Sequence, residues 1–208
     1  MPDLPEQPWE LLKQPDQRSC GAASMVVARM LADPAYAAFL AGSEGPVGLA
    51  FPRTVAGDAA LRERFKAETL AMHRRITGLA DVSGRAQIPW PRTFGTPPWA
   101  VARQLSGTPA ADGTLARYDW HVARTDLPAA YQRLLDAGNS DRVSAIFVGS
   151  TWMPRHVVLA VGATAHGTVN VYDPARGELS ELRRLAFLRG EIDIAGWDVA
   201  WFVVTPNA

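Results

Sequence analysis

The chain has 208 residues, of which 48% are hydrophobic, and its 21 basic and 21 acidic residues give a net charge of zero. This length and composition predict a single globular domain over residues 1–208, and the balanced charge argues against a dedicated nucleic-acid-binding protein. A single cysteine excludes an intramolecular disulfide and a zinc site built from cysteines.

The first residues contain neither a basic segment nor an apolar core of the kind found in secretory signals. No stretch approaches the ~20 consecutive apolar residues that a membrane-spanning helix needs. We therefore expect a soluble, cytoplasmic protein with no membrane partner. Export as an effector by a route that leaves no such signal stays open.

Two helices are predicted in the N-terminal half. The first covers residues 20–31, begins after Ser19 as its N-cap, and is interrupted at Pro34 and Gly42. The second covers residues 58–76, where apolar side chains recur on one stripe and five basic side chains form a solvated face. The segment 40–95 is interpreted as a helical and loop insertion.

The middle of the chain predicts two further helices. Thr96 followed by Pro97 and Pro98 is typical of a helix start, and the helix continues to Leu105. Residues 126–137 form the next helix, which Gly138 ends.

The last third has the pattern of strands. The expected strands cover residues 143–148, 156–162, 168–172 and 199–205. The second is a continuous apolar run, as in a strand buried on both faces. Helices followed by antiparallel strands predict the α+β class.

Cys20 stands at the start of the first predicted helix, three residues after Gln17 and six after Gln14. The positive end of a helix favours the thiolate over the thiol. A glutamine just upstream can donate a hydrogen bond to an oxyanion, and Gln14 is preferred over Gln17 for this role. A catalytic thiolate also needs a base, and two histidines are candidates.

His156 is the preferred base, and Asp173 is the acid expected to orient it. A hairpin centred near His166 would set Asp173 opposite Val158, two residues from His156, at a diagonal distance of ~7–8 Å between backbones. His121 is the reserve base. His73 and His166 are expected to face solvent.

Each of these residues also has an ordinary structural explanation. A lone cysteine in a helix of small residues is often a buried filler, a histidine at a strand start is often a satisfied core group, and Asp173-Pro174 is a common strand-ending turn. Gly21 and Trp152 are candidate substrate contacts, because they lie close in sequence to Cys20 and His156. Trp90 and Trp99 could line a cleft or secure a loop, whereas Trp197 and Trp201 fit core positions equally well.

The segment from Gln14 to Ser24, with Cys20-Gly21-Ala22 after the glutamine, resembles the double-glycine peptidase domains of bacteriocin exporters and their stand-alone bacterial relatives. The His156 strand, Asp173-Pro174 and the segment 95–98 resemble further elements of that family. The resemblance implies a papain-like fold, a Cys20, His156 and Asp173 triad, Gln14 as oxyanion donor, and neither cofactor nor metal.

The chain departs from the exporter domains in two respects. It carries no transporter sequence, and the interval between Cys20 and His156 is longer than theirs, so we do not expect their leader-peptide substrate. The segment 40–95 has no counterpart in the resemblance.

The sequence is compatible with three functions. The first is a cysteine peptidase that acts on a peptide or protein, with an inhibitor or immunity protein as a candidate partner. The second keeps the site but attacks a protein glutamine, as a deamidase or transglutaminase does. The third is a binding module that has lost catalysis.

Overall fold

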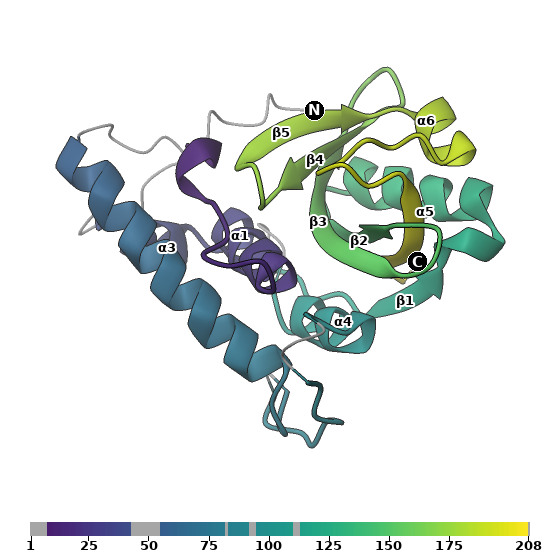
Figure 1. Cartoon of the computed structure of the whole chain (residues 1–208). Coiled ribbons are helices and arrows are strands. Elements are labelled where there is room, and N and C mark those ends of the chain that lie inside the picture. The colour runs from purple at the N-terminus through teal and green to yellow at the C-terminus, as the bar shows by residue number, and fades with distance from the viewer. Residues whose placement is uncertain (1–7, 43–54, 82, 92–94, 110–112, 208) are drawn as a thin grey trace.

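A computed structural model describes residues 8–42, 55–81, 83–91, 95–109 and 113–207. Its centre is an antiparallel six-stranded sheet with the strand order β1-β6-β2-β3-β4-β5. In Figure 1, α1 lies between α3 and the sheet, while α5 covers the opposite face. The mixed helical and antiparallel architecture confirms the α+β class.

Six α-helices are described, and two single-turn 3-10 helices accompany them. Their bounds are η1 Trp9–Leu11, α1 Cys20–Ala32, α2 Pro34–Ala41, α3 Val55–Ile76, α4 Pro98–Ser106, η3 Ala123–Thr125, α5 Leu127–Asn139 and α6 Arg184–Arg189. The strands are β1 Tyr118–Val122, β2 Ser144–Gly149, β3 Pro154–Ala163, β4 Val169–Asp173, β5 Glu178–Leu182 and β6 Val199–Pro206.

Two apolar cores fill the spaces on either side of the sheet. One joins α1, α2, α3 and α4 to the face that carries Phe147 and Leu159, and the other joins α5 and α6 to the face that carries Ile146 and Val158. This alternation along each strand is the period-two pattern of a sheet buried on both faces. The helix α1 is itself an interior element, since ten of its 13 residues are buried.

Pro34 begins a helix rather than merely interrupting one. The Asp33 side chain accepts hydrogen bonds from the backbone N–H groups of Ala35 and Tyr36, both at 3.0 Å, and so caps α2. Proline suits the first helical position because its missing N–H would have no partner there. The sequence pattern predicts only a helix interruption at Pro34, so α2 was not predicted.

Two other local predictions were wrong. Ser19 precedes α1, but its hydroxyl makes no capping bond and instead donates to the Asp16 carbonyl at 3.3 Å. His73 is only 7% exposed, because α3 turns it toward the segment that carries Asp16 and Arg18. Most of the basic face of α3 is exposed as expected, although Arg64 donates to the Leu40 carbonyl at 2.7 Å.

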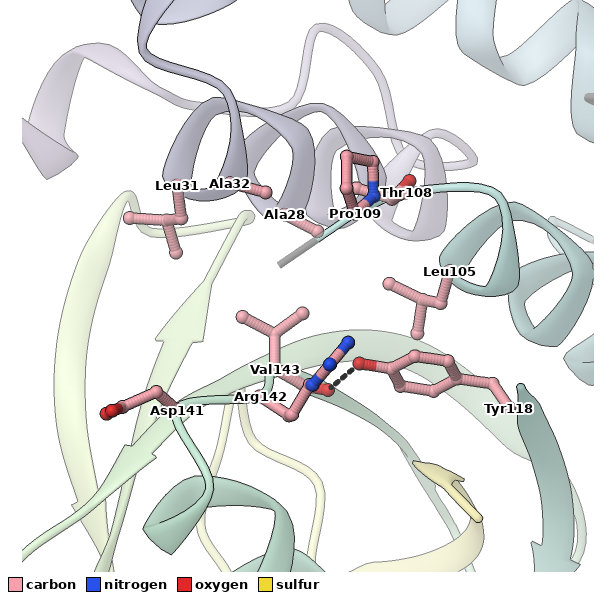
Figure 2. A pocket seen from close by; sticks show the side chains of 10 residues that line it. All are labelled: Ala28, Leu31, Ala32, Leu105, Thr108, Pro109, Tyr118, Asp141, Arg142 and Val143. Atoms are coloured by element: carbon pink, nitrogen blue, oxygen red, sulfur yellow. Dashed lines mark hydrogen bonds between the residues drawn. The ribbon is translucent and has the colours of Figure 1, made fainter. Parts of the chain in front are cut away.

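In the predicted insertion 40–95, the described part contains α3 and the turn that follows it; residues 43–54, 82 and 92–94 lie outside the described part. A small cavity of about 50 Å³ lies between α1 and the segment around Arg142 (Figure 2). The Tyr118 hydroxyl donates to the Val143 carbonyl at 3.1 Å on one side of it. Neither Cys20 nor a histidine lines this cavity, so it does not compete with the site described next.

In the described part of the chain, no single helix is long and apolar enough to span a membrane. The helices α1 and α2 pass such a test only when counted together across a bend of 115°.

Candidate active site

Cys20 is the first residue of α1 and is buried, with 4% of its surface exposed. The residues that follow it are small, which allows α1 to pack closely on β3. The Ser24 hydroxyl donates to the Val157 carbonyl at 3.4 Å. Because residues four apart lie on one helix face, and because Val157 follows His156, this contact holds Cys20 near the histidine.

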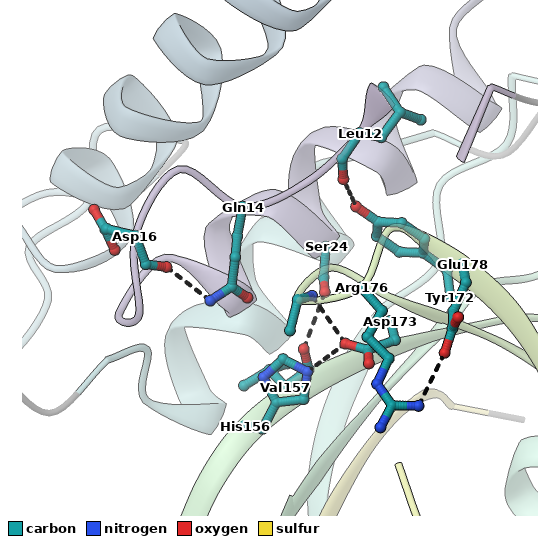
Figure 3. Close-up of polar contacts among 11 residues, drawn as sticks. Leu12, Gln14, Asp16, Ser24, His156, Val157, Tyr172, Asp173, Arg176 and Glu178 are labelled. Carbon is teal, nitrogen blue, oxygen red and sulfur yellow. Dashed lines mark hydrogen bonds and ion pairs between the residues drawn. The ribbon is translucent and has the colours of Figure 1, made fainter. Parts of the chain in front are cut away.

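His156 and Asp173 form a buried pair. The His156 Nε2 and Asp173 Oδ1 atoms are 2.7 Å apart, and the two side chains are 6% and 2% exposed (Figure 3). Leu159 pairs with Tyr172 in the β3–β4 ladder, so one further step along each strand sets Asp173 opposite Val158. The expected register is therefore confirmed, and the pair is a diagonal neighbour contact of the kind predicted.

The environment of His156 favours the imidazolium. Burial alone would lower the pKa of His156, but hydrogen bonds and electrostatic interactions with Asp173 and Cys20 raise it to about 9. Since Asp173 takes Nε2, the ring presents Nδ1 to Cys20. The imidazole thus bridges the thiol and the carboxylate, which is the arrangement that activates a cysteine nucleophile.

Asp173 remains a carboxylate in this setting. Burial would raise the pKa of Asp173, but hydrogen bonds from His156 and from the Ala175 N–H, at 2.9 Å, together with the His156 and Arg176 charges, lower it below its usual value. The neighbouring Tyr172 hydroxyl donates to the Leu12 carbonyl and ties this strand to the N-terminal segment (Figure 3).

Gln14 lies close to the Asp173-Pro174 turn. Its backbone N–H donates to the Pro174 carbonyl at 2.8 Å, and its side-chain Nε2 donates to the Asp16 carbonyl at 2.7 Å (Figure 3). One of the two amide N–H bonds is therefore used within the turn before α1. Gln14 does not line the pocket at Cys20, and its oxyanion role stays a prediction. Gln17 is exposed on the same turn.

A pocket of about 330 Å³ opens beside Cys20 and His156. Its walls are mostly apolar, and aromatic rings alternate there with proline and aliphatic side chains. The aromatic side chains that line it are Trp90, Trp99, Trp120, Phe147, Trp201 and Phe202. The Trp90 and Trp99 rings meet edge to face with centroids 5.2 Å apart, so these two residues both line the cleft and brace each other.

Trp201 reaches the pocket through an irregularity that the sequence did not reveal. In the β2–β6 ladder, Phe147 pairs with Phe202 and Val148 with Ala200, which leaves Trp201 as an extra residue. A bulge of this kind redirects a side chain, and here the adjacent residues Trp201 and Phe202 both line the pocket. The Trp201 indole donates to the Ser150 carbonyl at 2.8 Å.

Three of the residues considered from sequence lie elsewhere. Trp152 is 87% exposed in the β2–β3 turn and does not line the pocket, because extended chain carries it away from His156. Gly21 does not line the pocket either, but packs against Thr96. His121 alternates with Trp120 along β1, so the two side chains point to opposite sheet faces. Burial and the Arg133 charge lower the pKa of His121 against the opposing effect of Asp119.

Within the described residues, no group of three histidine, cysteine or acidic side chains is arranged to hold a metal ion. Comparison of the chain with models of protein families gives no match, and comparison with the sequences of curated proteins gives none.

Proposed function

We propose that the chain is a cysteine peptidase of papain-like fold whose triad is Cys20, His156 and Asp173. The observation that carries the proposal is the buried line of three groups, in which Asp173 holds one ring nitrogen at 2.7 Å and the other meets Cys20. A structural cysteine needs neither a charged imidazole nor a carboxylate behind it.

The reaction follows from the charges at rest. The Cys20 thiolate attacks the substrate carbonyl carbon, a C–S bond forms, and the carbonyl electron pair moves to oxygen. When the intermediate collapses, the C–N bond breaks and the His156 imidazolium gives its proton to the leaving amine. Water then attacks the thioester while His156 takes its proton, the C–S bond breaks, and a carboxylic acid leaves with the thiolate and the imidazolium restored. Asp173 keeps the ring oriented throughout.

The pocket supports a substrate with a bulky apolar residue close to the attacked carbonyl. Its aromatic walls offer a large apolar contact area, and a substrate side chain placed there would be removed from water. Peptides with an aromatic or large aliphatic residue near the cleaved bond should therefore be preferred over peptides built from glycine, serine or acidic residues.

The same thioester can form on a glutamine side chain, in which case ammonia leaves and the chain acts as a deamidase, or as a transglutaminase if an amine replaces water. Intact-mass analysis of peptides incubated with the purified protein separates these reactions. Two fragments with new termini indicate proteolysis, whereas a gain of one dalton on an uncut peptide indicates deamidation. Cys20→Ala is the control.

No change in any peptide of a diverse library, with Cys20 unreactive toward thiol reagents, would contradict catalysis. That result would favour the third function, a binding module.

A further inference from the structure

Thr96 is a buried threonine whose hydroxyl makes no hydrogen bond within the described part of the chain. It is 6% exposed, and no described residue is within hydrogen-bond reach of its Oγ1. A threonine beside a helix start commonly caps the helix with its hydroxyl. Here Pro97 is the N-cap and Pro98 the first helical residue, and no side chain caps α4. The hydroxyl is therefore available to a ligand.

Thr96 is held next to the nucleophile. It lines the same pocket as Cys20 and His156. A Cβ built on Gly21 would lie 2.6 Å from the Thr96 Oγ1 and 2.7 Å from its Cβ, so only glycine allows this approach. Gly95, with φ of +75°, makes the turn that brings Thr96 against the first turn of α1.

The first turn of α1 supplies further donors at the same place. The N-terminal N–H groups of a helix have no partners within it and carry partial positive charge. The Ser19 side chain makes no hydrogen bond to any of them. The Ala23 N–H donates to the Ser19 carbonyl at 2.8 Å and is the only described donor to it, so the N–H groups before Ala23 do not use this carbonyl. Helix N–H groups and the Thr96 hydroxyl thus lie together beside Cys20.

We propose that the Thr96 hydroxyl is a hydrogen-bond donor to the oxyanion, acting beside the N–H groups of α1. This inference rests on the proposed function. When the thiolate forms the C–S bond, the carbonyl electron pair moves to oxygen, and the Thr96 O–H donates to that oxygen. When the carbonyl reforms, the leaving group departs and Thr96 keeps its proton. A buried hydroxyl without a partner is costly in the resting protein, and the oxyanion removes that cost.

The test compares two reactions of Cys20 that differ in one respect. Acylation by p-nitrophenyl acetate passes through an oxyanion, forms a C–S bond and releases p-nitrophenolate. Alkylation by iodoacetamide displaces iodide and forms no oxyanion. Both need the thiolate, so their ratio isolates stabilisation of the oxyanion from reactivity of the sulfur. The single cysteine keeps the assignment simple, and Cys20→Ala corrects for other nucleophiles.

Thr96→Val should lower the acylation rate by about 10²-fold, the typical loss for one oxyanion donor, with the alkylation rate unchanged within about twofold. Thr96→Ser should retain most of the acylation rate, because it keeps the hydroxyl. Thr96→Val should melt no lower than wild type, since its lost hydroxyl had no partner. Thr205→Val is the matched control, because Thr205 is also buried, its hydroxyl has no partner among the described residues, and it lies outside the pocket.

Equal acylation by wild type and Thr96→Val would overturn the inference, as would a parallel loss in both reactions. If the valine variant does not fold, Thr96→Ala and Thr96→Ser give the same contrast, since both lack the γ-methyl and only serine keeps the hydroxyl. Failure of the proposed function is a separate result: wild-type Cys20 would then react with iodoacetamide no faster than N-acetylcysteine.

Discussion

The two halves of the candidate site are built differently. The acid–base half, His156 and Asp173, stands on paired strands, and the bond that joins the two side chains is buried. The donor half, Gln14 and Thr96, stands on the segments that lead into α1 and α4, and each residue carries a buried polar atom with no partner among the described residues, Gln14 Oε1 and Thr96 Oγ1.

The two halves differ in where their hydrogen-bond partners come from: the chain itself pairs His156 with Asp173, whereas the Thr96 hydroxyl is left for a substrate. A buried polar group without a partner costs free energy, so natural proteins keep few of them unless they serve a purpose. The acid–base half is set by sheet register, and its His156–Asp173 bond forms without a ligand, although Asp173 Oδ2 has no partner among the described residues. In the donor half, the Thr96 hydroxyl lines the pocket and gains a partner when an acceptor enters it.

The largest effect should come from removing the nucleophile or the base. Cys20→Ser and His156→Gln should each lower kcat/KM by at least ~10⁴-fold, because residues that act as a unit lose almost everything when one is removed. The volume changes are small, so circular dichroism and melting should remain close to wild type. Retained turnover in either variant would show that the substituted residue is not the nucleophile or the base.

Asp173 orients rather than reacts, so the result should depend on what replaces it. Asp173→Ala should lower kcat/KM by ~10²-fold or more through a mispositioned imidazole, whereas Asp173→Asn should stay within ~10-fold of wild type. The amide oxygen of asparagine can still accept from the ring N–H, and the proposed mechanism forms no new imidazolium during attack. Equal collapse of both variants would mean that the carboxylate charge itself is required.

Gln14→Ala should lower kcat by about 10-fold with KM little changed, because its remaining N–H is one donor among several at the oxyanion. Gln17→Ala, on the same turn but exposed, is the matched control and should match wild type. A large loss with Gln17→Ala and none with Gln14→Ala would transfer the oxyanion role from Gln14 to Gln17.

The smallest effect concerns stability. Because folding raises the pKa of His156 from 6.5 to about 9, the folded state retains a proton that the unfolded chain loses. This stabilisation is complete below pH 6.5 and is lost as the pH rises toward 9, by on the order of 1–3 kcal/mol. Urea unfolding at pH 6 and pH 9 measures it, and His156→Gln should flatten the difference. If the free energy of unfolding changes equally between pH 6 and pH 9 in wild type and in His156→Gln, the buried ion pair is contradicted.

Sequence predicted the acid–base half better than the donor half for a physical reason. The central strands are apolar runs whose spacing fixes a register, and Asp173 follows from it. The edge strands β1 and β5 were missed because each has one neighbour and alternates with polar residues, which resembles a loop. The Trp201 bulge and the contact of Thr96 with Gly21 depend on packing between distant segments, which no local pattern encodes.

The alkylation rate of Cys20 by iodoacetamide at pH 6 tests directly whether Cys20 is an activated nucleophile. An ordinary thiol, with pKa ~8.5, is almost fully protonated there, so a thiolate paired with the His156 imidazolium should react at least ~10²-fold faster than N-acetylcysteine. The same chain unfolded in urea, and the His156→Gln variant, should both lose this advantage. Alkylation of the folded wild-type protein no faster than N-acetylcysteine would mean that His156 does not activate Cys20.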